Sequence, residues 1–234
     1  MADILLIHGA SHGAWCWSKL IPHLKEMGHS ARAIDLPSHG DDPTPPGTVT
    51  IADYVDACTD ALGDDTILVG HSLGGLTITL AAAQHPDRIR ALVYLCAFVP
   101  PPGQPFAEIR KDAVTSDLQT AVSVDREAGI STILTETAPP VFYQDCRPED
   151  VAYALPRLSP QPIAVLTEPL MFTPPELPRH YIRCTEDRVV KPAYQTAVSS
   201  DWPKDNVHEI ACGHSPFFSH PDRLAGILDK IANT

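Results

Sequence analysis

The chain has no excess of positive charge and no apolar run long enough to cross a membrane. Its 17 Lys and Arg residues are outnumbered by 29 Asp and Glu residues, giving a formal net charge of -12 at pH 7. An acidic surface disfavours nucleic acid and anionic membranes as partners, because both are negatively charged. The first residues also lack the basic segment and the apolar stretch of a secretory signal. We therefore expect a cytoplasmic protein that binds neither nucleic acid nor a membrane.

Cysteine pairs at metal-binding spacing are absent as well. The six cysteines are scattered, without a Cys-x-x-Cys motif, at positions 16, 58, 96, 146, 184 and 212. Several of them stand within apolar runs, so we expect buried free thiols rather than disulfides. The spacing supports neither a cysteine nucleophile nor a zinc site. No metal or cofactor is expected, because the serine chemistry derived below needs neither.

Short apolar runs alternate with amphipathic segments over most of the chain. The runs predict strands at residues 4–7, 31–34, 66–69, 91–95, 180–184 and 207–210. The segments between them predict helices at residues 17–27, 51–62, 75–85, 192–199 and 221–233. Such alternation is typical of an α/β fold with a mostly parallel sheet and helices on both faces.

The pattern changes between residues 100 and 178, where more than half of the 24 prolines lie and strand signals almost vanish. A connection of about 80 residues is too long for an ordinary loop. We therefore predict a lid inserted over the sheet edge. The core would then consist of residues 1–99 and 179–234, with the lid at 100–178, in a single domain overall.

Residues 70–74 read Gly-His-Ser-Leu-Gly, directly after one predicted strand and before a helix. This layout is typical of a nucleophile elbow, a tight turn that presents a serine at the carboxyl edge of a sheet. The backbone N–H of Leu73 and the helix N-terminus would face the same point. Ser72 is therefore the candidate nucleophile, and the alternative is an idle serine in a glycine-rich turn.

A serine nucleophile needs a base to take its proton. His214 follows the predicted strand 207–210 in a Gly-His turn, which would place its ring at the carboxyl edge of the sheet. The other histidines after Ser72 are expected at helix ends or within strands: His85, His180, His208 and His220. His214 is the candidate base, and the alternative is a solvated loop histidine.

The base in turn needs an orienting carboxylate. Asp187 follows the predicted strand 180–184 by a short turn and would lie at the same edge. It is favoured over the remaining carboxylates of this region, which are Glu186, Asp201 and Asp205.

An oxyanion hole requires a second backbone N–H besides that of Leu73. After the first predicted strand, His8 and Gly9 can form a tight turn that presents the amide of Ala10. We expect His8 itself to brace this loop.

Together these residues resemble the α/β-hydrolase superfamily and, more narrowly, the family of plant methylesterases, including the salicylic-acid-binding esterase, and hydroxynitrile lyases. The resemblance rests on residues 8–15, 28–29, 33–36, 70–75, 97–100, 184–187 and 213–214, and on the lid segment 143–150. It implies a catalytic triad of Ser72, Asp187 and His214, oxyanion donors at Ala10 and Leu73, and Phe98 in the acyl pocket. The family often forms dimers, so a homodimer is the candidate assembly.

Two further positions bear on the reaction. The lyases of the family carry threonine where this chain has Gly9, and a lysine where it has Ser215. That lysine holds the departing cyanide, and Ser215 cannot supply its charge. Both positions, taken as substrate-binding, indicate the esterase side of the family.

The sequence therefore predicts a serine carboxylesterase for a small, largely apolar ester of methyl or aryl type. The alternatives are a hydroxynitrile lyase-like enzyme and a non-catalytic small-molecule receptor on the same fold. The candidate pocket liners are Phe98, Phe142, Tyr143, Leu155, Leu166 and Phe172.

Overall fold

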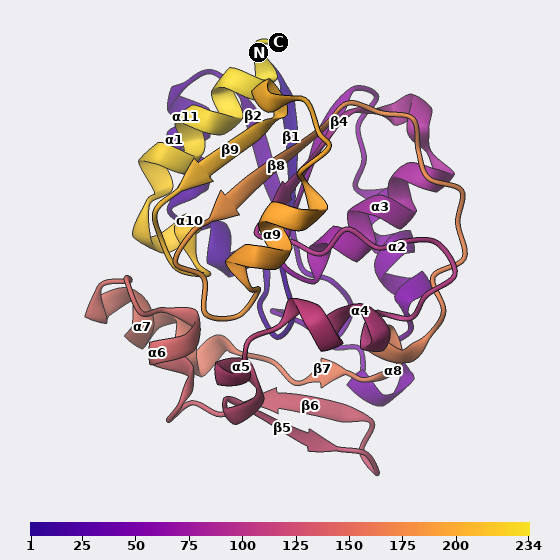
Figure 1. Ribbon diagram of the computed structural model, residues 1–234, viewed down its shortest axis with the longest axis vertical. Helices are drawn as coiled ribbons and strands as arrows, with labels where there is room; N and C mark the ends of the chain where they lie inside the picture. The colour runs from indigo at the N-terminus through magenta and orange to yellow at the C-terminus, as the bar shows by residue number, and fades with distance from the viewer.

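A six-stranded sheet, parallel throughout, forms the centre of the computed structural model, which describes residues 1–234 (Figure 1). Its spatial order is β2-β1-β3-β4-β8-β9. The strands are β1 (Asp3–Ile7), β2 (Ser30–Ile34), β3 (Thr66–His71), β4 (Ile89–Leu95), β8 (Arg179–Cys184) and β9 (Val207–Ile210). All six predicted strands are present, and the predicted α/β class is confirmed. The continuous apolar runs form strands that are buried on both faces, as in β3.

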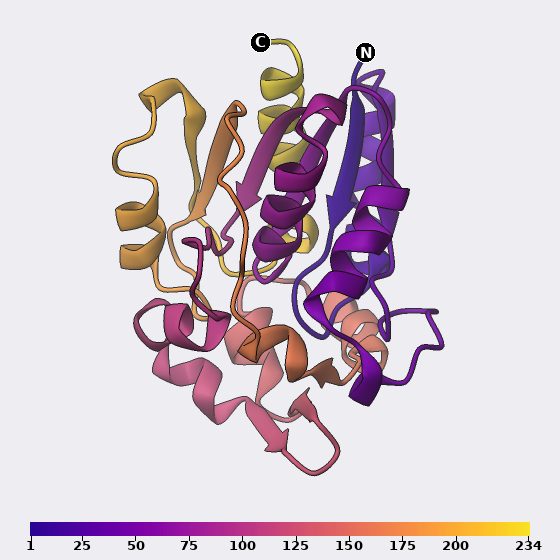
Figure 2. The same cartoon turned by 90° about the vertical axis from the view of Figure 1, so that its right-hand side faces the viewer.

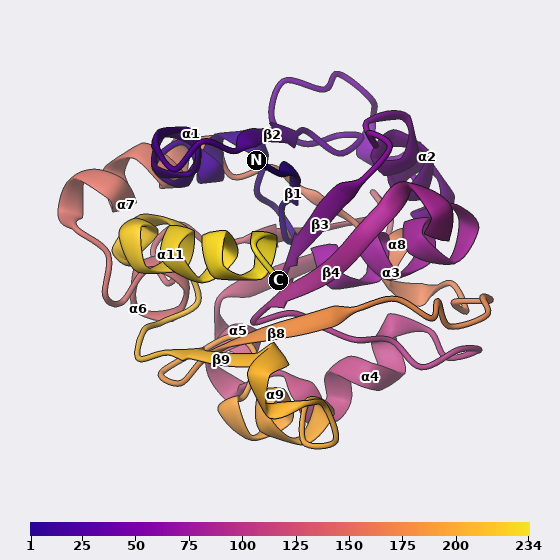
Figure 3. The ribbon, with the colours of Figure 1, turned by 90° about the horizontal axis from the view of Figure 1, so that it is seen from above.

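Helices cover both faces of this sheet, as Figure 3 shows from above. One face carries α1 (Leu20–Glu26) and α11 (Pro221–Ala232). The other carries α2 (Ile51–Asp60), α3 (Gly74–Gln84) and α9 (Pro192–Val198), and a short α10 (Pro216–Ser219) precedes α11. Helix α2 begins at a capping box, in which the side chains of Thr50 and Asp53 bond each other's backbone N–H groups. No helix combines the length and the apolar character needed to span a bilayer.

One predicted helix needs correction. The segment predicted as one helix from residue 17 is split into a 3-10 turn (Ala14–Trp17) and the shorter α1. Further single 3-10 turns stand at Pro46–Thr48, Pro86–Arg88, Leu155–Arg157 and Lys204–Asn206. Such turns commonly connect or end helices, and periodicity does not separate them from α-helix.

The lid, residues 100–178, lies beyond the carboxyl ends of the strands (Figures 1 and 2). It contains the helices α4 (Phe106–Ala113), α5 (Ser116–Thr120), α6 (Ala138–Phe142), α7 (Pro148–Ala154) and α8 (Ala164–Thr167). It also contains an antiparallel sheet of β5 (Val122–Asp125), β6 (Ile130–Ile133) and β7 (Gln161–Pro162). The expectation that strands almost vanish here was wrong. These strands have two to four residues, and the mostly exposed β5 lacks a buried apolar pattern.

The first turn of α3 packs directly against the backbone of neighbouring strand ends. A side chain at Gly74 would lie 2.7 Å from the carbonyl oxygen of His8 and 2.8 Å from that of Ile7. On the other side of the turn, a side chain at Gly70 would lie 2.7 Å from the carbonyl oxygen of Gly74. Glycine is therefore required at both ends of the turn that carries Ser72.

We predict that Gly74→Ala lowers the free energy of unfolding by about 3 kcal/mol, because its methyl group has only backbone to displace. The matched control is Gly226→Ala in α11, where an added methyl group meets nothing within 4 Å. That variant should gain about 0.5–1 kcal/mol from helix propensity. Urea unfolding of both variants measures the difference, and equal stabilities would contradict the packing argument.

Candidate active site

Ser72 follows β3 in a left-handed backbone conformation with φ of 53°. Non-glycine residues seldom adopt this conformation, and where they do it is often at a functional turn. Ser72 lines a pocket between the sheet edge and the lid. The structure brings four other predicted site residues to the lining of the same pocket: Ala10, Leu73, Phe98 and His214.

Asp187 and His214 are hydrogen-bonded to each other behind this pocket. Nδ1 of His214 lies 2.9 Å from Oδ2 of Asp187, and the two side chains are 2% and 0% exposed. The carboxylate therefore fixes the orientation of the imidazole and favours the Nδ1–H tautomer. In that tautomer Nε2 is the free acceptor, as a general base at the pocket requires.

The Asp187 carboxylate is also held by three other donors. Its Oδ1 accepts the backbone N–H groups of Val189 at 2.7 Å and Val190 at 3.0 Å, and its Oδ2 accepts Nε2 of Gln195 at 3.0 Å. Gln195 is fully buried on α9, and its Oε1 accepts the backbone N–H of Cys184. Gln195 was not predicted as a site residue, because its only signal in the sequence is a polar side chain on the buried side of a short helix.

Two backbone amides beside Ser72 are free to bind an oxyanion. The N–H groups of Ala10 and Leu73 donate no hydrogen bond within the protein, whereas the N–H of Ser72 bonds the carbonyl oxygen of Leu95. Unpaired backbone donors are uncommon in a protein interior. Their presence at a pocket indicates a site for a negatively charged oxygen.

The loop that carries His214 is held by a second histidine. His71 donates from Nε2 to the carbonyl oxygen of His214 at 2.8 Å, and Sγ of Cys96 lies 3.7 Å from the same oxygen. Burial, followed by the neighbouring His214, lowers the pKa of His71 well below its ordinary value. His71 is therefore a neutral donor that positions the candidate base. It stands inside the elbow motif, but nothing in the motif indicated this contact.

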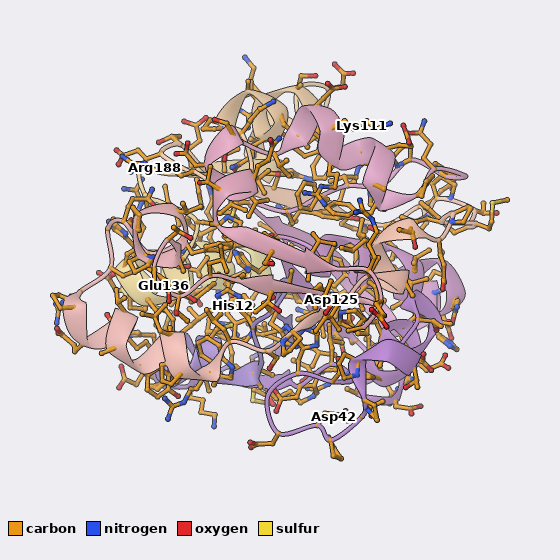
Figure 4. The ribbon with its side chains drawn as sticks, turned by 90° about the horizontal axis from the view of Figure 1, so that it is seen from below. His12, Asp42, Lys111, Asp125, Glu136 and Arg188 are labelled. Carbon is orange, nitrogen blue, oxygen red and sulfur yellow. The ribbon has the colours of Figure 1, made fainter.

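His12 joins the loop of the candidate oxyanion hole to the lid. Its Nδ1 lies 2.8 Å from the carbonyl oxygen of Ala10, and the hydroxyl of Tyr143 lies 2.8 Å from its Nε2. Burial lowers the pKa of His12 to about 4, so the neutral ring donates to Ala10 and accepts from Tyr143. Figure 4, viewed from the lid side, places His12 near the middle of this face.

His8 braces the same loop, as expected. Its Nδ1 lies 2.8 Å from the carbonyl oxygen of Gly9, and its Nε2 accepts the backbone N–H of Leu36 at 3.1 Å. Burial lowers the pKa of His8 well below its ordinary value, so this ring is neutral too. The loop is thereby tied to the chain that follows β2.

The pocket encloses a cavity of about 80 Å³, and eleven of its twenty lining residues are hydrophobic. Of the candidate liners, Phe98, Phe142 and Leu166 are in its wall. Tyr143, Leu155 and Phe172 are not, and Tyr143 instead holds His12. Such a wall suits a small, mainly apolar ligand.

Gly9 and Ser215 lie behind the pocket and not in its wall. A Cβ at Gly9 would lie 2.9 Å from both Cβ of Ser72 and Nδ1 of His71. Ser215 is fully buried, and its hydroxyl has no hydrogen-bond partner. Neither residue lines the pocket itself, but each adjoins residues that do: Gly9 adjoins Ala10 and Ser72, and Ser215 adjoins His214.

Two groups of side chains lie close enough to share a metal ion, but members of each group are already engaged in hydrogen bonds within the protein. In the first, His71 and Cys96 both face the carbonyl oxygen of His214. The second comprises Asp145, Cys212 and His220. There Oδ2 of Asp145 accepts the backbone N–H of Gly213, and Nδ1 of His220 lies 2.9 Å from Oγ of Ser219. We assign no metal site to either group.

Comparison with known proteins places this site in a family. Residues 4–227 match the alpha/beta hydrolase family. Methylesterase 7 of Arabidopsis thaliana is 32% identical over 98% of this chain and 95% of its own length. Two crystal structures align with the whole chain: a pyrethroid hydrolase from Sphingobium faniae JZ-2 (27% identity, 98% of that chain, TM-score 0.88) and the methylesterase MES16 from Arabidopsis (26%, 99%, 0.85).

The fold, the serine and histidine in the pocket wall and the aspartate bonded to that histidine thus define an alpha/beta hydrolase. The chain belongs to this family and, within it, to the methylesterase group. It is accordingly a carboxylic ester hydrolase, and the predicted family resemblance is confirmed.

The buried neutral histidines predict a loss of stability in mild acid. Unfolding returns the pKa of His12 from about 4 to its ordinary 6.5. The unfolded chain therefore binds more protons than the folded chain between these pH values, and the free energy of unfolding decreases as the pH is lowered. His12 alone should cost about 2 kcal/mol between neutral pH and about pH 5. Urea unfolding across this range should show a smaller pH dependence for His12→Gln than for wild type.

The matched control for this series is His23→Gln, because His23 lies half-exposed on α1. A pH dependence that is the same in His12→Gln and wild type would show that the ring of His12 is not the proton acceptor.

Proposed function

We propose that this protein is a serine carboxylesterase that hydrolyses small, largely apolar carboxylic esters of methyl or aryl type. The observation that carries the proposal is one pocket lined by Ser72, by His214 in its hydrogen bond to Asp187, and by two residues with unengaged amides. A nucleophile, an oriented base and an oxyanion site are the three parts that acyl transfer requires.

In the first half of the proposed reaction, Nε2 of His214 takes the proton of Ser72 as Oγ attacks the ester carbonyl carbon. The N–H groups of Ala10 and Leu73 stabilise the negative charge on the carbonyl oxygen. The alcohol then leaves with the proton from His214, and the acyl group stays on Ser72. Asp187 stabilises the imidazolium without taking its proton.

In the second half, a water molecule occupies the place of the alcohol. His214 takes its proton, and the hydroxide attacks the acyl carbon within the same oxyanion site. The carboxylic acid leaves as Oγ of Ser72 recovers a proton from His214. The cycle returns the enzyme to its starting state, and its proton transfers need only His214.

The relatives support an ester as the substrate class. Methylesterase 7 and MES16 are named as methylesterases, and the Sphingobium enzyme is named as a pyrethroid hydrolase. The mainly hydrophobic wall around Ser72 supports the apolar character proposed for the acyl group.

We predict that Ser72→Ala lowers kcat by roughly 10⁴-fold or more on a panel of methyl and aryl esters, because only binding and the oxyanion site remain. Acid release measures the loss. The control is Ser200→Ala, which changes an exposed serine after α9 and should keep wild-type turnover. Undiminished activity in folded Ser72→Ala would refute the assignment, and tight ligand binding without turnover by wild type would indicate a receptor.

A further inference from the structure

One cationic side chain outside the proposed triad lines the pocket, and it comes from the lid. Arg110 of α4 is half-buried in the pocket wall, and no Asp or Glu is among the lining residues. The nearest carboxylate to the reacting atoms, that of Asp187, is already bonded to His214 and Gln195. The pocket therefore has a mainly hydrophobic wall with a single fixed positive charge.

Helix geometry explains why Arg110 faces the pocket. Phe106 and Arg110 are four residues apart on α4, which places them on the same side of the helix, and Val114 is the residue that caps its C-terminal end. All three line the pocket, and the ring of Phe106 packs on that of Phe98 at 4.6 Å between centroids. An arginine thus stands in the middle of a stripe that is otherwise apolar.

The guanidinium of Arg110 has no partner within the protein, since it makes neither an ion pair nor a hydrogen bond to any other residue. The acidic residue of the same helix, Glu108, is paired with Lys111 at 2.6 Å. Lys111, labelled in Figure 4, is exposed and is not among the residues that line the pocket. A partly desolvated cation without a counter-charge is unfavourable, and a ligand anion would remove that cost.

A hydroxyl group in the wall can assist such an anion. Ser131 of β6 lines the pocket, and its side chain makes no hydrogen bond to the protein. A guanidinium fork matches the two oxygens of a carboxylate, and a hydroxyl can donate a further hydrogen bond. The lid therefore offers a carboxylate-binding set in the same pocket that holds the candidate nucleophile.

We propose that Arg110 determines specificity, and that the preferred substrates are monoesters whose acyl group carries a second, free carboxylate. This inference rests on the proposed esterase function and names its substrate class. The ester carbonyl lies at Ser72, the apolar chain of the acyl group lies against the hydrophobic wall, and the free carboxylate binds Arg110. The product is then a dicarboxylic acid.

The test compares the monomethyl and dimethyl esters of one series of dicarboxylic acids, from succinate to suberate, at about pH 7.5, where the free carboxyl group is ionised. We expect kcat/KM for the best monomethyl ester to exceed that of its dimethyl ester by about 10-fold or more, mainly through KM. In Arg110→Met this preference should disappear, because the dimethyl ester has no free carboxylate for the guanidinium to bind and only the monomethyl ester loses a contact.

Lys111→Met is the matched control, because it removes a positive charge from the same helix outside the pocket. It should keep the preference for the monoester, which separates direct contact from the general field of the lid. A wild type that prefers the dimethyl ester at every chain length would overturn the inference. So would an Arg110→Met enzyme whose preference is unchanged.

A binding measurement separates this inference from the proposed function. Calorimetry with the Ser72→Ala protein should show that monomethyl esters bind about 10-fold or more weakly when Arg110→Met is added. If folded wild type hydrolyses no ester, the proposed function fails, and the calorimetry still tests Arg110. Equal affinities with and without Arg110 would refute the inference alone.

Discussion

The structure around the pocket depends on a close approach of backbone to backbone at the first turn of α3. Gly74 lies against the carbonyl groups that end β1, and Gly70 lies against the turn itself. Because no side chain separates these segments, the turn can close tightly, and Ser72 adopts a left-handed conformation within it at the sheet edge. The same approach brings Ala10 and Leu73 to one pocket with their amides unengaged. The proposed nucleophile and the proposed oxyanion site are thus products of one packing constraint.

Hydrogen bonding then orients the groups around the turn without adding charge. Burial keeps His71 and His12 neutral, so they act as donors to the carbonyl oxygens of His214 and Ala10. The carboxylate of Asp187 accepts four hydrogen bonds, including that of His214. When the imidazole of His214 is protonated, the firmly held carboxylate of Asp187 is the counter-charge beside it. Such a counter-charge is the condition for His214 to act as a base.

Core and lid contribute different properties to the pocket. The proposed reacting groups come from strand ends of the sheet, which rigid hydrogen bonding holds in place. The lid supplies much of the surrounding wall, including Phe142, Leu166 and Arg110. A division of this kind allows substrate preference to change with the lid while the chemistry of the core stays the same. It also explains why membership in the methylesterase group indicates the class of reaction but not which acyl group is preferred.

The sequence by itself determined the six core strands, the elbow and the strand ends that carry Asp187 and His214. These signals are local, because buried parallel strands are continuous apolar runs and their carboxyl ends share one edge. Only the tertiary structure decided the contacts of Gln195, His71 and His12. His12, for example, meets Tyr143 across 131 residues of sequence. The short lid strands and the inward position of Arg110 were likewise decided by packing, since exposed strands and single charges leave no periodic pattern in a sequence.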